Sequence, residues 1–193
     1  IIGSLIGSYF VITNGILIAI ILGFAILSIY FYSTKIVDSG LGEFFVAVKG
    51  SMIVIGTFFI QSGEVTVESI FAGIVIGTLS SLVLFIASFP DHDADKSKGR
   101  KTLVIVVGKE KATKLFWIFP LIAYSVILIG IFVNLFPILS LISFLSFPLI
   151  LKSGLGLKKN YNSIDNLVPF MSSSLKFSRI TGILFALSFL ISF

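Results

Sequence analysis

Residues 67–103, VESIFAGIVIGTLSSLVLFIASFPDHDADKSKGRKTL, combine the two features that decide the fold. The first part, Val67 to Phe89, is almost entirely apolar and long enough to cross a bilayer, since a transmembrane helix needs about 20 such residues. The second part, residues 90–103, is a polar run in which three aspartates precede a cluster of lysine and arginine. The stretch therefore predicts a membrane-spanning helix that leads into a charged segment at the membrane surface.

The composition of the whole chain agrees with a membrane protein. Of its 193 residues, 56% are hydrophobic and only 12% are charged, whereas a soluble domain has about 25% charged residues. The mean hydropathy is +1.13. The chain contains no cysteine, which excludes a disulfide framework and thiol chemistry. We therefore expect a lipid bilayer around the protein and no nucleic-acid partner.

Apolar stretches of membrane length recur along the chain and predict an all-α, polytopic transmembrane helical bundle in a single domain, residues 1–193. Residues 1–10 are typical of the tail of an earlier helix, closed by a turn near Thr13-Asn14-Gly15. About six full spans follow this partial helix. The predicted spans are Ile12 to Tyr32, Glu43 to Phe59 or Ile60, Val67 to Phe89, Ala112 to Val133, Pro137 to Leu151, and Leu175 to Phe193.

The distribution of basic residues among the predicted loops tests this topology. All 14 lysines and arginines fall after the first, third and fifth predicted spans, whereas the loops after the second and fourth hold none. Alternate loops lie on opposite faces, so the positive-inside rule predicts that the basic face is cytoplasmic. The basic residues are Lys35 and Lys49; Lys96, Lys98, Arg100, Lys101, Lys109, Lys111 and Lys114; and Lys152, Lys158, Lys159, Lys176 and Arg179. The expected location is the cell membrane, with the aspartate-rich loop in the cytoplasm.

The spacing of Asp91 and Asp95 indicates a metal site. If the third predicted helix continues through them, residues four apart point to one side of it. Two carboxylates at a membrane surface suit Mg²⁺, whose remaining positions are filled by water or phosphate oxygens. The basic side chains that follow suit a polyanion carried with its metal, such as a diphosphate. Asp93 points off that face and is either a second-shell ligand or solvated.

Two other interpretations compete for the same run, of which the first remains open and the second fails. The first is a cytoplasmic loop whose charges only anchor the topology, because two aspartates four apart occur often by chance. The second is an EF-hand, since DHDAD has the beginning of such a calcium loop. That motif requires Gly at position 6 and Glu at position 12, where this chain has Lys96 and Thr102. His92 has no second histidine to share a metal and is better explained as solvated.

FPDHDADKSKGRKTLVIVVGKEKA, residues 89–112, resembles the second aspartate-rich motif of the UbiA superfamily of intramembrane prenyltransferases. The matching positions are Asp91, Asp95, Gly99, Lys101-Thr102-Leu103 and Gly108. Tyr32-Ser33 and GLGEFFVAVKGSMIVIGTFFIQSG, residues 40–63, are similar to the branch that acts on 1,4-dihydroxy-2-naphthoate in menaquinone synthesis. The C-terminal NLVPFMSSSLKFSRITGILFALSF is similar to that branch's last helix, so the resemblance covers nearly the whole chain.

The chain also departs from the family pattern. The proline that usually follows the Tyr-Ser pair is absent, and Ala87 or Ser88 replaces an asparagine before the motif. These departures concern the assignment of the acceptor more than membership of the superfamily. Nothing matches the family's first aspartate motif, and the family has nine helices. We therefore expect this chain to be the C-terminal two-thirds of the family fold, and to be inactive alone because half of the metal clamp is absent.

The resemblance implies Mg²⁺-dependent transfer of a polyprenyl group from its diphosphate to an aromatic acceptor. In this interpretation Asp91 and Asp95 hold one Mg²⁺, and Tyr32 lies near the diphosphate or the allylic cation. The alternative for Tyr32 is an interfacial tyrosine. The expected substrate-binding residues are Lys98, Arg100, Lys101, Lys35, Lys49 and Ser33. At least one of the basic residues after the aspartates is expected to be only a topology anchor.

Other functions fit parts of the sequence. Other branches of the superfamily act on 4-hydroxybenzoate or on geranylgeranylglyceryl phosphate. The CDP-alcohol phosphotransferases also use membrane aspartates, but the only Gly-Arg pair here, Gly99-Arg100, follows the aspartates instead of preceding them. A non-enzymatic transporter or scaffold is a different class of function. A transporter is expected to have charged or broken helices near mid-membrane, whereas the predicted spans carry charge only near their cytoplasmic ends.

Overall fold

The computed structural model describes residues 2–31 and 40–191, and every regular element in these residues is a helix. The predicted all-α class is confirmed. The elements are α1 (Ile2–Asn14), α2 (Ile16–Phe31), α3 (Gly42–Ser62), α4 (Val67–Ala87), α5 (His92–Ser97), α6 (Leu103–Val107), α7 (Lys109–Leu115), α8 (Ile118–Phe132), the 3₁₀ helix η3 (Ile138–Ser146), α9 (Phe147–Asn160) and α10 (Ile164–Ile191).

Five helical stretches among the described residues are long and apolar enough to cross a membrane. They are Gly42–Ser62, Val67–Ala87, Lys109–Phe132, Ile138–Asn160 and Ile164–Ile191. They correspond to the last five predicted spans, and the first two of the five agree with prediction to within a few residues. The fifth predicted span was too short, because η3 and α9 together continue to Asn160. The sixth was placed too late, since α10 begins at Ile164 and not at Leu175.

The first predicted span differs from the structure. Residues 12–14 belong to α1, and a break at Gly15 separates this helix from α2. Gly15 has φ +84°, a left-handed conformation that glycine adopts without a steric penalty. The turn predicted near Thr13-Asn14-Gly15 is therefore confirmed, but two short helices replace one span. At 1.5 Å per residue, the 16 residues of α2 extend about 24 Å.

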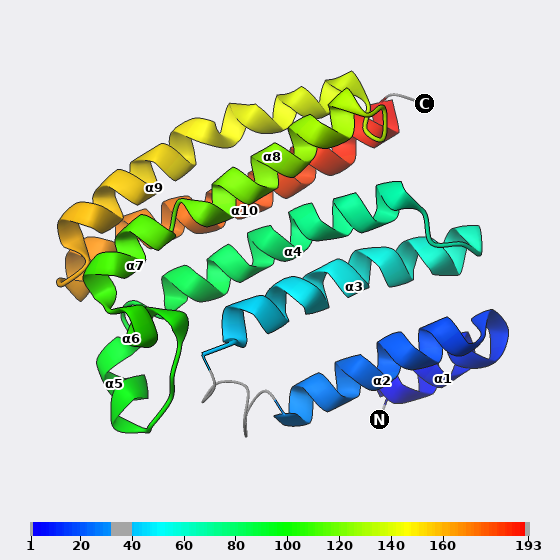
Figure 1. Cartoon of the computed structure of the whole chain (residues 1–193), viewed down its shortest axis with the longest axis horizontal. Coiled ribbons are helices and arrows are strands. Elements are labelled where there is room, and N and C mark those ends of the chain that lie inside the picture. Colours follow the sequence, from blue (N-terminus) through cyan, green and yellow to red (C-terminus); the bar gives the residue numbers. More distant parts are fainter. Residues whose placement is uncertain (1, 32–39, 192–193) are drawn as a thin grey trace.

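The helices form a bundle in which α4 is central (Figure 1). This helix packs against α3 on one side and against α8 and α10 on the other. Its buried side chains Val75, Leu82 and Phe85 are inaccessible to solvent and join the core that α8, α9 and α10 complete. The α1–α2 pair lies beyond α3 (Figure 1), and α2 packs against α3.

Small residues explain the close approach of α3 and α4. A Cβ atom at Gly77 would clash with the backbone oxygen of Ala47, and one at Gly73 would lie 2.9 Å from the backbone oxygen of Ser51. Small residues at such contacts let two membrane helices pack backbone to backbone. The Ser51 hydroxyl donates to the Gly73 carbonyl oxygen at 2.9 Å across the same contact, so α3 and α4 are joined tightly along their length.

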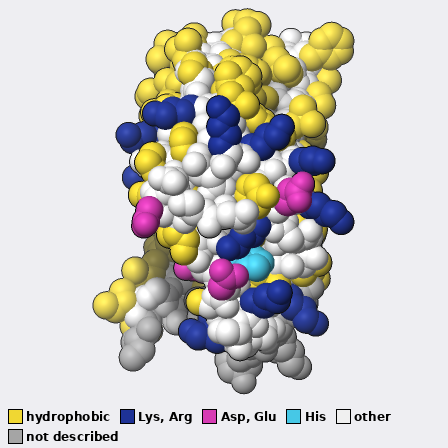
Figure 2. Space-filling view, turned by 90° about the vertical axis from the view of Figure 1, so that its left-hand side faces the viewer, with side chains coloured by type: hydrophobic (Ala, Val, Ile, Leu, Met, Phe, Trp, Pro, Cys, Tyr) yellow, Lys and Arg dark blue, Asp and Glu magenta, His cyan; other side chains and the backbone are white. Residues whose placement is uncertain are grey.

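The two ends of the bundle differ in chemistry. The α3–α4 turn and the connection from α8 to η3 lie at one end (Figure 1). The opposite end carries α5, α6, α7 and the α9–α10 connection. Viewed toward that second end, lysine and arginine side chains are spread over the face, with acidic side chains among them and one of these beside the histidine (Figure 2). The fold therefore brings the polar run, residues 90–103 and hereafter the aspartate segment, together with many of the basic residues.

Candidate active site

The aspartate segment is separate from α4. This helix ends at Ala87, a turn covers residues 88–91, and α5 begins at His92. The third helix therefore does not continue through both aspartates, which was the condition for placing them on one face of it. Pro90 supplies the reason, because a proline has no N–H to donate and disfavours helical backbone at the residue before it.

Asp91 and Asp95 nevertheless lie one helical turn apart. Asp91 is the N-cap residue of α5, and its carbonyl oxygen accepts the Asp95 N–H at 2.8 Å. The same-side relation expected from spacing is thus retained in a short helix of its own. Two such carboxylates fit one Mg²⁺ whose other ligands are water or phosphate oxygens. Within residues 2–31 and 40–191, no group of three or more histidine, cysteine, aspartate or glutamate residues could hold a metal.

Arg100 lies close to this pair of carboxylates. Its Nη1 contacts Asp95 Oδ1 at 2.9 Å, and the Asp95 side chain is only 13% exposed. The chain returns toward Asp95 through Gly99, which has φ +76°, and the Arg100 N–H donates to the Asp95 carbonyl oxygen at 3.0 Å. The ion pair fixes the orientation of the Asp95 carboxylate and places a guanidinium beside it.

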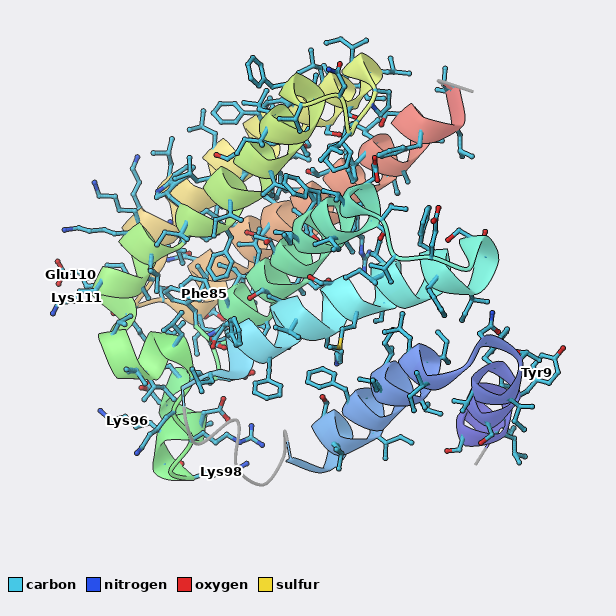
Figure 3. The ribbon with its side chains drawn as sticks, turned by 45° about the vertical axis from the view of Figure 1, so that its right-hand side comes forward. Tyr9, Phe85, Lys96, Lys98, Glu110 and Lys111 are labelled. Atoms are coloured by element: carbon cyan, nitrogen blue, oxygen red, sulfur yellow. The ribbon has the colours of Figure 1, made fainter. Side chains whose placement is uncertain are left out.

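The remaining lysines of the aspartate segment, Lys96, Lys98 and Lys101, make no ion pair with another residue within 2–31 and 40–191. Lys98 and Lys101 are exposed, and Figure 3 shows Lys96 and Lys98 extending away from the bundle beside α5. Lys101 precedes Thr102, whose side chain caps α6 by accepting the Ile105 N–H at 3.4 Å. The segment thus offers an aspartate pair and several cations on one end of the bundle.

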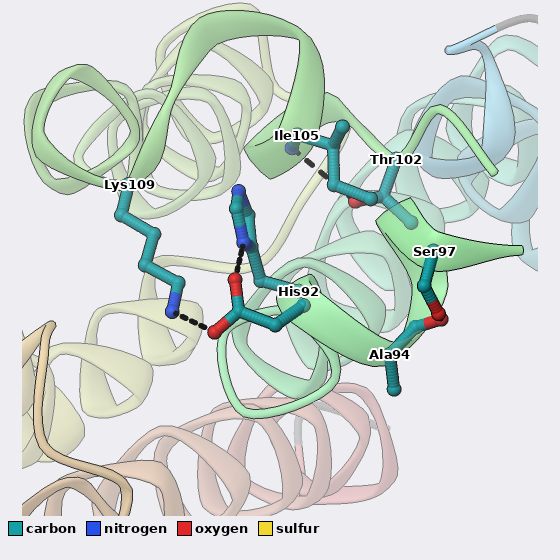
Figure 4. Close-up of polar contacts among 7 residues, drawn as sticks. His92, Ala94, Ser97, Thr102, Ile105 and Lys109 are labelled. Carbon is teal, nitrogen blue, oxygen red and sulfur yellow. Dashed lines mark hydrogen bonds and ion pairs between the residues drawn. The ribbon is translucent and has the colours of Figure 1, made fainter. Parts of the chain in front are cut away.

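Asp93 has partners of its own, away from the Asp91–Asp95 pair. His92 Nδ1 lies 2.7 Å from Asp93 Oδ1, and Lys109 Nζ lies 3.4 Å from Asp93 Oδ2 (Figure 4). The hydrogen bond from His92, together with the charge and hydrogen bond of Lys109, lowers the pKa of the Asp93 carboxyl. Asp93 therefore links α5 to α7. The expectation that His92 is solvated was wrong, because its side chain is only 13% exposed and contacts Asp93.

Four other predicted site residues lie apart from the aspartate segment in the sequence. Tyr32, Ser33 and Lys35 are outside the described residues. Lys49 is an exposed residue of α3. It precedes Gly50, where an added Cβ atom would lie 2.8 Å from the Gly77 Cα of α4, so Lys49 lies at the level of the middle of α4.

Arg179 is a charged residue whose position the sequence analysis misjudged. Because α10 begins at Ile164, Arg179 lies within this helix and not at its end. The adjacent Ser178 donates to the carbonyl oxygen of Leu79, midway along α4, at 3.2 Å. The expectation that spans carry charge only near their ends was therefore wrong. Arg179 lines a groove of about 360 Å³ between α4 and α10, and intramembrane charges commonly mark functional sites.

Fold and site together define an α-helical membrane protein with a polar site at one end of its bundle. The model of the UbiA prenyltransferase family matches residues 1–175, and the chain belongs to this family. The resemblance stated from the aspartate motif is thereby confirmed.

Two curated relatives have the same name, 1,4-dihydroxy-2-naphthoate octaprenyltransferase. The protein of Bacillus subtilis (strain 168) is 29% identical over 153 residues, which are 79% of this chain and 49% of the relative. The protein of Escherichia coli (strain K12) is 27% identical over 157 residues, 79% of this chain and 50% of the relative. The chain thus spans about half the length of these relatives. No solved structure matches it significantly.

Proposed function

We propose that the whole protein transfers a polyprenyl group from its diphosphate to an aromatic acceptor of the 1,4-dihydroxy-2-naphthoate type, as a step in quinone synthesis. The observation that carries the proposal is the Asp91–Asp95 pair, one helical turn apart and beside the Arg100 guanidinium. Membership of the UbiA family and the names of the two curated relatives support the reaction class and the acceptor.

The residues of this chain have distinct tasks in the proposed reaction. Asp91 and Asp95 hold Mg²⁺, which neutralises charge on the diphosphate when it is bound. Lys98, Arg100 and Lys101 bind the diphosphate oxygens, and their positive charge is preorganised where negative charge develops as the carbon–oxygen bond breaks. Tyr32, Ser33, Lys35 and Lys49 are assigned to the same substrate, Tyr32 near the prenyl cation.

Alanine substitution of each aspartate tests this assignment. In the whole protein, in membranes supplied with Mg²⁺, polyprenyl diphosphate and acceptor, Asp91→Ala and Asp95→Ala each lower turnover by about 100-fold or more, the scale of losing one preorganised electrostatic partner. Asp93→Ala is the matched control, because its carboxylate is engaged by His92 and Lys109. Near-normal turnover in both Asp91 and Asp95 variants would refute the proposal.

The proposed location is the cell membrane, with the aspartate segment in the cytoplasm. The basic residues at that end of the bundle support this orientation through the positive-inside rule. Because the chain has no cysteine, single cysteines placed at Ser97 and Ser62 report the two ends separately. In intact cells an impermeant maleimide labels Ser62→Cys and spares Ser97→Cys until the membrane is opened. The reverse pattern contradicts this orientation.

A further inference from the structure

Arg179 is a cation inside a membrane-spanning helix that the reaction outlined above does not use. It lies within α10 (Ile164–Ile191), and the neighbouring Ser178 holds this turn of α10 against Leu79 of α4 through the 3.2 Å hydrogen bond. Within residues 2–31 and 40–191, the Arg179 side chain forms no hydrogen bond or ion pair. A charge in a membrane span is costly and commonly marks a ligand site, so an anionic partner is expected.

The groove beside Arg179 has the size and lining of a site for a flat ring. Its volume is about 360 Å³, and ligand pockets start at about 300 Å³, with mostly apolar walls and a few polar groups that fix orientation. The apolar part of the lining is Ile76, Leu79, Ile183 and Ala186.

Arg179 is the group in this lining that can bind an anion. The other polar side chains of the lining are Ser80 and Ser178. Both hydroxyl groups donate to backbone oxygens of α4, Ser80 to Ile76 at 2.9 Å and Ser178 to Leu79. Arg179 is exposed, and its guanidinium keeps all of its N–H donors for a ligand.

Charge distinguishes this groove from two other pockets of the described residues. A pocket of about 240 Å³ includes Glu43, whose carboxylate accepts the Leu103 N–H at 3.2 Å. A pocket of about 720 Å³ includes Glu68. Neither has a described lysine or arginine in its lining. An anionic ligand is repelled by the carboxylates of these two pockets and attracted by Arg179.

The groove also lies within reach of the aspartate segment. Leu79 precedes Ala87, the last residue of α4, by eight residues, which is about 12 Å along the helix axis. Helix α10 begins at the end of the bundle that carries α5 (Figure 1). Because Cα–Cβ bonds in a helix tilt toward its N-terminus, the Arg179 side chain leaves α10 in the direction of the aspartate segment.

We propose that the groove between α4 and α10 holds the aromatic acceptor, and that the Arg179 guanidinium binds the carboxylate of this acceptor. The inference rests on the proposed function, in which the acceptor is a hydroxylated naphthoate, and it names the residue that recognises the acid group. A guanidinium donates two parallel N–H bonds to a carboxylate, and the apolar walls pack against the fused rings. With the acid group held at Arg179, the rings occupy the side of the groove nearer to the diphosphate-binding residues.

An acceptor without the carboxylate separates this role from a structural one. In the whole protein, we expect Arg179→Gln to raise the KM for 1,4-dihydroxy-2-naphthoate about tenfold or more, the scale of a hydrogen bond to a charged group. The KM for 1,4-dihydroxynaphthalene and the KM for polyprenyl diphosphate stay at wild-type values. Arg179→Lys keeps the charge but loses the paired donors, so its KM for the naphthoate lies between those of wild type and Arg179→Gln.

Lys176→Gln is the matched control, because Lys176 is an exposed cation one turn away on α10 and is not part of the groove lining. We expect it to leave both acceptor KM values unchanged. Three results overturn the inference: an unchanged KM for the naphthoate in Arg179→Gln, an equal rise for both acceptors, or an equal rise in Lys176→Gln. The second result assigns Arg179 to structure, and the third assigns the effect to the general positive field.

Equilibrium dialysis of the unreactive probes 2-naphthoate and 2-naphthol keeps the inference distinct from the proposed function and requires no turnover. We expect the wild type to bind 2-naphthoate about tenfold more tightly than 2-naphthol, and Arg179→Gln to lose this preference. That result without any prenyl transfer by the wild type retains the groove and rejects the reaction. Equal binding of the two probes to the wild type rejects the groove, whatever the turnover.

Discussion

The α8–α10 half of the bundle and the aspartate segment use polar residues differently. In the bundle, polar side chains pair with each other between helices: the Tyr124 hydroxyl lies 2.9 Å from Ser146 Oγ, which lies 2.6 Å from Thr181 Oγ1. In the aspartate segment, Asp93 and Asp95 form ion pairs at the surface, whereas Asp91 and Lys98 are exposed and make no side-chain hydrogen bond or ion pair within residues 2–31 and 40–191. Paired polar groups hold membrane helices together, whereas free ones remain available to a ligand. The contrast distinguishes residues that stabilise the fold from residues that are available to bind a substrate.

A bulky residue at Gly77 tests the packed region and has the largest expected effect. Gly77→Leu pushes a side chain into the Ala47 backbone. Overpacking of this kind costs about 1–3 kcal/mol, and here it falls on two rigid backbones. We expect a lower thermal midpoint in detergent and little folded protein. Gly23→Leu is the matched control, because nothing lies within 4 Å of a Cβ there; equal losses in both variants would contradict a specific α3–α4 contact.

Removing Arg100 tests the aspartate segment and has an intermediate effect. Arg100→Ala deprives Asp95 of its partner at 2.9 Å and the diphosphate of a cation. We expect the KM for polyprenyl diphosphate to rise about tenfold, which corresponds to about 1.4 kcal/mol, with unchanged thermal stability. Lys111→Ala, at an exposed position of α7 (Figure 3), is the control. A KM equal to that of the control would assign Arg100 to topology alone.

Acid titration of Asp93 sharpens the contrast and has the smallest expected effect. His92 and Lys109 lower the pKa of Asp93 in the folded protein. The link to α7 therefore stabilises the fold at pH values above the unfolded-state pKa of about 3.9, and this stabilisation is lost as the pH falls through the lower folded-state pKa. We expect Asp93→Asn to be slightly less stable than wild type near pH 5 and equal to it at pH 2. A difference that grows below pH 4 would contradict the link.

The sequence predicted the long apolar helices well and their polar ends poorly. Val67 to Phe89 was placed to within two residues, because hydrophobic length alone defines such a span. The start of α10 was missed because its first turns are polar and Lys176 and Arg179 were taken as loop charges. The break at Gly15 was located as a turn, but the apolar residues on both sides of it concealed that the helices are short.

The candidate site was predictable only where it depends on local spacing. The same-side relation of Asp91 and Asp95 follows from their separation by four residues, even though Pro90 separates them from α4. The partner of Asp93 on α7 lies 16 residues away, and the bond between Glu43 and Leu103 joins residues 60 apart. Such contacts depend on how the helices pack, which the spacing of residues in the sequence does not specify.

Binding of inorganic diphosphate, with and without Mg²⁺, tests the central claim most directly. Calorimetry on the whole purified protein measures the affinity for wild type, Asp91→Asn and Asp93→Asn without requiring turnover. The proposed Mg²⁺ pair predicts that wild type and Asp93→Asn bind diphosphate much more tightly with Mg²⁺ than without it, and that Asp91→Asn loses about tenfold or more of the Mg²⁺-dependent affinity. The same Mg²⁺-dependent affinity in all three proteins would contradict the assignment of Asp91 and Asp95 as the metal pair.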